Sequence, residues 1–250
     1  MSEGGLQVKS SCILEDVNHL TEKAVAHYWR TRIAQKEKQE HTGKIDQGLR
    51  RAVTGGAQMD GFTDMVVELV MRAGIPERCI FRKKSVELPG YFRPTKEWDL
   101  LVVNGQTLVA AIEAKSQVGP SFGNNFNNRT EEALGSAVDL WTAYRENLYL
   151  SSPQPFLGYL FMLEDCDASN KPVMVQEPHF KVAPEFIGVS YKRRYELFCR
   201  KLVLERHYTA AALLVSSAEK GSVGTFTVPA EDLSVERFAR VLVSHLGAFV

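Results

Sequence analysis

The fold is decided by one stretch near the middle of the chain, WDLLVVNGQTLVAAIEAK, which spans residues 98–115. Two mainly apolar runs, Trp98–Val103 and Thr107–Lys115, are separated by Asn104-Gly105. Asn-Gly favours a tight hairpin turn because both residues tolerate positive φ, and apolar runs on either side favour strands. The sequence therefore predicts an antiparallel pair of strands.

Three charged residues interrupt these two strands. Asp99 lies in an otherwise apolar run, where a charge is costly without a purpose, and Glu113 and Lys115 end the second run. Side chains alternate between the two faces of a strand, so Glu113 and Lys115 share a face. Hairpin pairing brings Asp99 to the same edge, and we predict that the three charges form one patch.

Two carboxylates beside a lysine are a minimal set of groups for phosphodiester hydrolysis. Carboxylate oxygens suit Mg²⁺, a hard cation that keeps several of its waters. The metal polarises a phosphate and generates hydroxide from bound water, while a lysine stabilises the charge that develops on the phosphate. The alternative is a salt-bridged strand pair at a sheet edge, because these residue types are common and the bare pattern occurs by chance.

The remaining elements are read outward from this hairpin. Apolar periodicity and stop signals predict helices over 17–39, 60–73, 129–147, 191–207 and 235–246, the third capped by Asn128. Further strands are predicted over 79–88, 156–163 and 210–216. This order of elements predicts an α/β fold with a mixed central sheet flanked by helices.

Composition sets broad limits on the class of protein. The chain has 250 residues, 44% hydrophobic and 24% charged, and a formal net charge of zero. Zero net charge opposes a non-specific nucleic-acid coat protein but permits a nuclease with a local basic groove. We find no secretory signal and no apolar run long enough for a membrane span, so we expect a cytoplasmic protein without a membrane partner.

The segment after Lys115 is rich in groups that can read bases. It holds Gln117, four asparagines and an arginine, which we interpret as a DNA-contacting loop: Asn124, Asn125, Asn127, Asn128 and Arg129. Asparagine and glutamine can pair bidentately with adenine, and arginine with guanine. A glycine- and asparagine-rich surface loop with a helix cap is the plain alternative. A second candidate for DNA contact is the basic run Lys192, Arg193 and Arg194.

The run from Glu113 to Ala133, EAKSQVGPSFGNNFNNRTEEA, resembles the signature of the XhoI-type family of type II restriction endonucleases. That family lies in the PD-(D/E)XK nuclease superfamily. The resemblance implies a PD-(D/E)XK core and Asp99, Glu113 and Lys115 as the catalytic set. It departs from the superfamily pattern at Trp98, which stands where proline often precedes the aspartate.

The same resemblance implies how such an enzyme would act. We expect Mg²⁺-dependent cleavage of double-stranded DNA by a homodimer at a short palindrome, leaving 5′-phosphates. Type members of the family cut CTCGAG. A cognate methyltransferase is expected in the same genome, though not as a bound subunit. By analogy with the superfamily, an acid of an early helix joins the metal site, and Glu68 is the candidate.

The chain is expected to divide into a helical N-terminal extension, residues 1–55, and a catalytic domain, residues 56–250, which together form one compact unit.

One rival interpretation is an α/β serine hydrolase, because Gly119 to Gly123 matches the nucleophile pattern G-x-S-x-G with Ser121 as nucleophile. A helix should follow that serine directly, yet Asn124 to Asn128 make a poor helix start. Another rival is a DNA-binding module with an inactive nuclease site.

Overall fold

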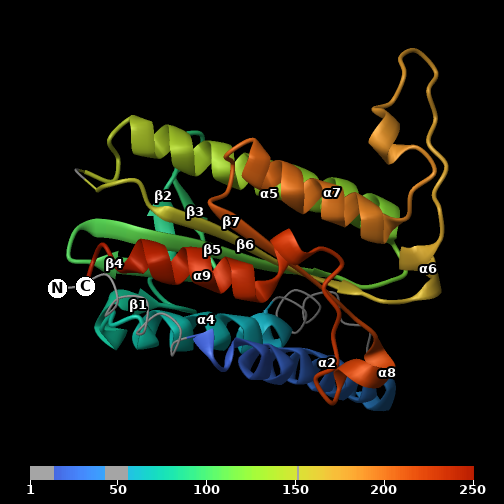
Figure 1. Ribbon diagram of the computed structural model, residues 1–250, viewed down its shortest axis with the longest axis horizontal. Helices are drawn as coiled ribbons and strands as arrows, with labels where there is room; N and C mark the ends of the chain where they lie inside the picture. Colours follow the sequence, from blue (N-terminus) through green and yellow to red (C-terminus); the bar gives the residue numbers. More distant parts are fainter. Residues whose placement is uncertain (1–13, 43–55, 151) are drawn as a thin grey trace.

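The computed structural model describes residues 14–42, 56–150 and 152–250. A five-stranded mixed sheet in the order β1-β4-β5-β6-β7 forms the centre of the molecule. Helices α2, α4 and α9 cover one face of it, and α5 and α7 cover the other (Figure 1). The strands of this sheet are β1 Ile80–Phe81, β4 Leu100–Asn104, β5 Thr107–Gln117, β6 Phe156–Glu164 and β7 Ala210–Ser216. The predicted mixed sheet flanked by helices is confirmed.

The predicted hairpin is present as β4 and β5, which pair antiparallel. Asn104 pairs with Thr107, and Gly105 takes a φ of +62°, in the left-handed region that glycine tolerates. Leu100 lies opposite Ile112, so the same register continued by one residue sets Asp99 opposite Glu113. Strands β5, β6 and β7 run parallel to one another, which makes β5 the junction between the two halves of the sheet.

The two faces of the sheet bury two apolar cores. Leu100 and Ile112 pack toward α2, α4 and α9, whereas Leu101 and Ala111 pack toward α5 and α7. Strand β7 is buried along its whole length, as is usual for a parallel strand covered on both faces. Alternation along β5 therefore directs Glu113 and Lys115 to the α5 side of the sheet.

The helices largely follow the predicted pattern. The longer ones are α2 Val17–Thr42, α4 Asp60–Arg72, α5 Phe122–Arg145, α7 Tyr191–Leu204 and α9 Val235–Leu246. The short ones are α6 Asp167–Asn170 and α8 Ala218–Gly221, and four 3₁₀ turns are Ala57–Met59, Glu77–Cys79, Pro184–Phe186 and Glu231–Leu233. In the part of the chain that the structure describes, no helix has both the length and the apolar character of a membrane span.

Helix α2 packs into the same apolar core as α4, α9 and one face of the sheet. Its buried side chains include Val25, Tyr28 and Trp29. Tyr28 donates a hydrogen bond of 3.1 Å to Ser116, which links the helix to β5. The proposed division at residue 55 lies outside the described residues and stays a prediction.

The predicted strand over 79–88 is wrong in its middle. Only Ile80–Phe81 joins the main sheet, as β1. Lys83 and Ser85 have φ of 64° and 54°, which breaks the extended run. The chain then forms a separate antiparallel pair, β2 Glu87–Pro89 with β3 Thr95–Glu97. This second hairpin has no counterpart among the predicted elements.

The predicted loop Asn124 to Arg129 is also wrong, because these residues form the first turns of α5. The helix begins at Phe122, which is buried and stacks on Tyr191 with 5.7 Å between ring centroids. Phe126 packs edge-on against Tyr195 at 5.0 Å. Because helix stability in proteins comes mainly from tertiary packing, these aromatic contacts override the weak helix propensity of the asparagines.

Candidate active site

The three predicted residues meet where Asp99, just before β4, faces the second half of β5. Lys115 Nζ lies 3.1 Å from Asp99 Oδ2 and 2.6 Å from Glu113 Oε1. Asp99 Oδ2 also accepts a hydrogen bond of 2.8 Å from the Ala114 amide, which ties this acid to β5. The predicted convergence of the three charges is confirmed, while their catalytic role remains a prediction.

A second lysine completes the group. Lys96 of β3 places Nζ 2.7 Å from Glu113 Oε2, on the opposite side of the carboxylate from Lys115. The same ammonium lies 4.2 Å from the ring centroid of Trp98 and donates to the Glu97 carbonyl oxygen at 2.8 Å. Buried Trp98, which replaces the usual proline, thus forms one wall for the lysine.

The charges shift one another's ionisation. Burial raises the pKa of Asp99 and outweighs the opposing attraction of Lys115. Burial also disfavours charge on Glu113, but Lys115 and Lys96 together hold its pKa below the ordinary value. Burial would lower the pKa of Lys115, yet Glu113 and Asp99 raise it overall. Lys115 is therefore a persistent cation, better suited to stabilising negative charge than to abstracting a proton.

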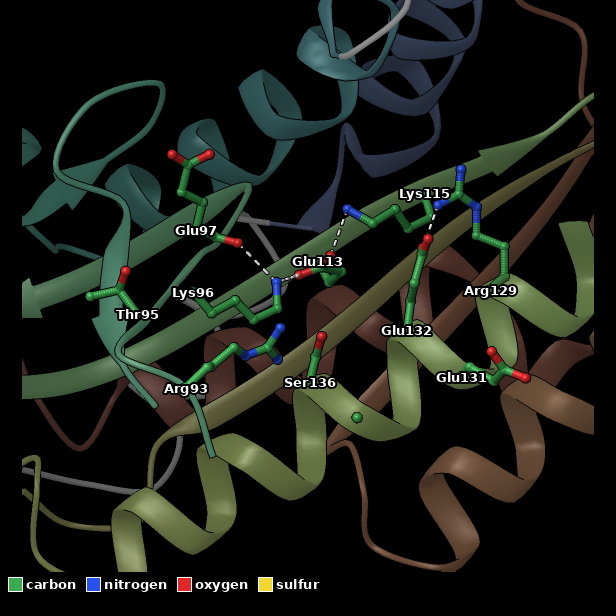
Figure 2. Close-up of a pocket in the computed structure, with 11 residues that line it drawn as sticks. Arg93, Thr95, Lys96, Glu97, Glu113, Lys115, Arg129, Glu131, Glu132 and Ser136 are labelled. Carbon is green, nitrogen blue, oxygen red and sulfur yellow. Dashed lines mark hydrogen bonds and ion pairs between the residues drawn. The ribbon is translucent and has the colours of Figure 1, made fainter. Parts of the chain in front are cut away.

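Glu113, Lys115 and Lys96 line a cleft of about 600 Å³ between the second hairpin and α5 (Figure 2). Its walls carry charged and polar side chains, namely Arg93, Thr95, Lys96, Glu97, Glu113, Lys115, Arg129, Glu131, Glu132 and Ser136. Arg129 and Glu132 form an ion pair of 2.5 Å on the α5 wall. A cleft with both acidic and basic walls can hold a metal ion together with a phosphate.

The donor set fits a hard divalent cation. Asp99 and Glu113 present carboxylate oxygens, the ligands that Mg²⁺ prefers. Among the described residues, no group of three or more acidic, histidine or cysteine side chains could hold a metal. A cation here would take two carboxylates from the chain and fill its shell with water and phosphate oxygens, as Mg²⁺ does.

Glu68, the candidate third acid, lines neither this cleft nor the neighbouring one that Asp99 lines. Its carboxylate pairs with Arg72 at 2.7 Å. Asp60, at the start of α4, lines a neighbouring cleft of about 210 Å³ together with Asp99. It lies two helical turns before Glu68, and a metal-binding role for Glu68 stays a prediction.

The candidate DNA-reading residues fall into different places. Gln117 is buried: its amide nitrogen donates to the Val118 carbonyl at 3.0 Å, and its amide oxygen accepts from Tyr195 at 3.1 Å. The structure thus opposes a base contact by Gln117. Of the five candidates in α5, Arg129 lines the cleft, Asn125 is half-buried, and three are exposed, namely Asn124, Asn127 and Asn128.

The basic run at the start of α7 is engaged within the protein. Lys192 lies 3.7 Å from Asp165, Arg193 pairs with Glu196, and Arg194 donates to the Val173 carbonyl at 3.2 Å. None of the three lines either of the two clefts described above. This run therefore lies outside the catalytic group.

Ser121 remains a poor nucleophile, although one argument against it fails. Helix α5 does begin directly after Ser121, contrary to the expectation from the asparagines. The serine is exposed, however, and within the described residues its hydroxyl makes no hydrogen bond to a histidine. A serine hydrolase needs such a base in contact with its nucleophile.

The second hairpin contributes residues to the cleft that were not predicted from the sequence. Arg93, Thr95, Lys96 and Glu97 all line the cleft, although none was a candidate. The available signal was their position directly before Trp98 and Asp99, between the turn residues Pro89-Gly90 and the first catalytic acid. Ser136 also lines the cleft. It lies on the face of α5 that the amphipathic pattern of the helix predicts to be buried, and it is buried in the structure.

A mixed sheet with this hairpin at its centre, helices on both faces and paired acids beside a lysine is the restriction endonuclease-like architecture, so the chain falls in the PD-(D/E)XK class of nucleases. The model of the restriction endonuclease XhoI family matches residues 38–228. The chain belongs to this family.

Individual relatives agree with the family match. The type II restriction enzyme BstVI of Geobacillus stearothermophilus is 54% identical over 207 residues, covering 81% of this chain and 92% of the relative. The type II restriction enzyme XhoI of Xanthomonas vasicola is 48% identical over 194 residues, or 77% of each chain. The type II restriction enzyme AbrI of Azospirillum brasilense is 49% identical over 169 residues, 67% of this chain and 76% of the relative. No solved structure matches the chain.

Proposed function

We propose that this type II restriction endonuclease hydrolyses double-stranded DNA at the cleft between its second hairpin and α5, with Mg²⁺ held by Asp99 and Glu113. The observation that carries the proposal is the position of Lys115, whose ammonium contacts both carboxylates at 3.1 and 2.6 Å. One ammonium within reach of both acids is also within reach of a phosphate bound to a metal ion that they would hold.

Each residue then has a distinct role. Asp99 and Glu113 supply oxygen ligands, and a divalent ion held there polarises the phosphate and activates a bound water. Lys115 stays charged and stabilises the negative charge that grows on the phosphate in the transition state. Water attacks phosphorus and the bond to the 3′ oxygen breaks, so the products carry a 5′-phosphate and a 3′-hydroxyl.

We further propose that the substrate is a short palindrome, and CTCGAG is the first sequence to test. One supporting observation is the 48% identity to a relative named as the restriction enzyme XhoI. A palindrome is read most simply by a two-fold dimer, with one half-site for each subunit. A cognate methyltransferase would protect the host DNA and is expected as a genetic partner only.

The test is digestion of a sequenced phage genome by the purified chain, followed by mapping of the cut ends. The proposal expects discrete fragments in Mg²⁺, none in a chelator, and ends that share one palindrome. Random degradation, or cutting that persists with the metal removed, would contradict it. A purified protein that binds duplex DNA without cutting it in any divalent metal would instead support the inactive-module alternative.

A further inference from the structure

The second hairpin, β2–β3, carries an exposed apolar tip beside the cleft. Glu87 pairs with Glu97 and Pro89 with Thr95, which leaves Gly90 to Pro94 as the connecting loop. Within that loop Tyr91 and Phe92 are 50% and 69% exposed, and their rings contact edge-on at 5.0 Å. Two adjacent exposed aromatic rings are costly in water unless a partner covers them.

Buried groups hold this tip in a fixed shape. Asp139 of α5 accepts hydrogen bonds from the amides of Tyr91 and Phe92 at 2.8 and 2.9 Å, and from Arg93 Nε at 2.6 Å. The Asp139 side chain is only 5% exposed. Burial raises its pKa, but these hydrogen bonds lower it below the ordinary value overall. On the other side of the turn, Tyr149 donates to the Pro89 carbonyl at 2.8 Å.

Close packing at the turn restricts its sequence. A Cβ added to Gly90 would lie 2.6 Å from Asp139 Oδ2 and 2.8 Å from the Arg93 carbonyl oxygen. The aspartate therefore reaches the two amides only because residue 90 has no side chain. An anchor of this kind gives the exposed rings a defined direction, which a loop that merely closes a hairpin does not need.

The hairpin is continuous with the proposed catalytic cleft. Four of its residues, Arg93, Thr95, Lys96 and Glu97, line that cleft. Arg93 uses Nε for Asp139 and leaves its side chain 43% exposed, and Figure 2 shows its guanidinium pointing into the same space as Lys96. A ligand that fills the cleft and extends past Arg93 would next meet the aromatic tip.

We propose that the β2–β3 hairpin is a DNA-contacting arm, in which Arg93 binds a phosphate beside the scissile one and Tyr91 and Phe92 pack on the adjoining duplex. The inference rests on the proposed function. Cations in the cleft and apolar rings beyond it match a phosphate backbone followed by sugar and base surfaces. If the arm instead packed against a second copy of the chain, nothing would require it to be continuous with the cleft.

The test measures affinity of the full-length protein for a short duplex that contains the mapped cut site, in Ca²⁺, with plasmid cleavage in Mg²⁺ measured beside it. Phe92→Ala combined with Tyr91→Ala should weaken binding by about tenfold or more, since both apolar contacts with the duplex are lost. The slope of log affinity against log salt should not change. Arg93→Ala should reduce that slope by about one, because one phosphate contact is lost.

Phe180→Ala is the matched control, since Phe180 is 88% exposed and lies in the α6–α7 connection, away from this hairpin in Figure 1. It should bind like the wild type. The inference fails if the aromatic variants keep wild-type affinity, or if they lose affinity only because the oligomer measured by light scattering dissociates. If the wild type itself cuts no DNA, the proposed function fails first, and the two failures are distinct.

Discussion

At the scale of single residues, Lys96 and Lys115 contact the same buried carboxylate from two sides. Only Lys115 also reaches Asp99. The two lysines therefore form a matched pair, because removing either leaves Glu113 with one cation. Any difference between the two variants reports on the additional contact of Lys115 with Asp99 and on catalysis, rather than on the charge balance of Glu113.

We predict that Lys115→Met reduces the cleavage rate by at least about 100-fold, as expected when a group that stabilises the transition state is removed. Lys96→Met should retain more activity, because Lys96 contacts one carboxylate only. Single-turnover cleavage of a plasmid measures both rates, and melting curves check that both variants fold. The reverse ranking would assign the catalytic role to Lys96.

At the scale of elements, the second prediction concerns the first turns of α5. Asn127 is exposed within a helix, not in a turn. Asn127→Ala should therefore keep or raise the melting temperature, because alanine has the higher helix propensity by a few tenths of a kcal/mol. If Asn127 reads a base, affinity for the cut site should fall by roughly 1–3 kcal/mol while non-specific binding is unchanged. A lowered melting temperature with equal loss on all duplexes would contradict both statements.

The third prediction concerns the turn of the β2–β3 hairpin. Gly90→Ala should destabilise the protein, because its Cβ would lie 2.6 Å from a buried carboxylate oxygen of Asp139. Gly135→Ala is the control for stability: its added Cβ meets no atom within 4 Å. In the middle of α5 that change should stabilise by roughly 0.5–1 kcal/mol. Equal melting temperatures for the two variants would show that the turn adapts without cost.

Elements with a strong local pattern were predictable, and those that depend on distant partners were not. The Asn104-Gly105 turn, strand Ala210–Ser216 and helix Val235–Leu246 follow from turn chemistry and periodicity, and the last two match their predicted bounds. The start of α5 was not predictable, because it depends on rings that α7 supplies. Lys96 was not predicted, because it lies on β3, a short strand that the apolar periodicity of the sequence does not reveal.

At the scale of the whole molecule, α9 joins the sheet through a titratable contact. His245 Nε2 lies 3.0 Å from the Val109 carbonyl oxygen of β5. Burial lowers the pKa of His245, and the hydrogen bond to Val109 only partly opposes this. The unfolded chain therefore binds the proton more readily than the folded one, so this contribution to stability is lost as pH falls below about 6.5 toward the folded pKa.

We predict that the free energy of unfolding, measured in urea, falls between about pH 7.5 and about pH 5.5 more steeply in the wild type than in His245→Gln. The glutamine variant keeps a hydrogen-bond donor but has no charge to gain. Identical pH dependence in the two proteins would remove His245 as a source of acid sensitivity.

Assembly is a property of the whole molecule as well. A chain of 28.0 kDa that reads a palindrome as a two-fold dimer should have a mass of about 56 kDa in solution. Light scattering, with and without duplex DNA, measures this mass. A monomer under both conditions would require another way of cutting the two strands.

The central claim is that Asp99, Glu113 and Lys115 form a metal-dependent catalytic group, and the most direct test is single-turnover cleavage of plasmid DNA by Asp99→Asn. The substitution keeps the size of the side chain and removes the negative charge that a metal needs. We predict a loss of at least about 100-fold in Mg²⁺ with an unchanged fold by circular dichroism. Cleavage at the wild-type rate, with the same Mg²⁺ requirement, would contradict it.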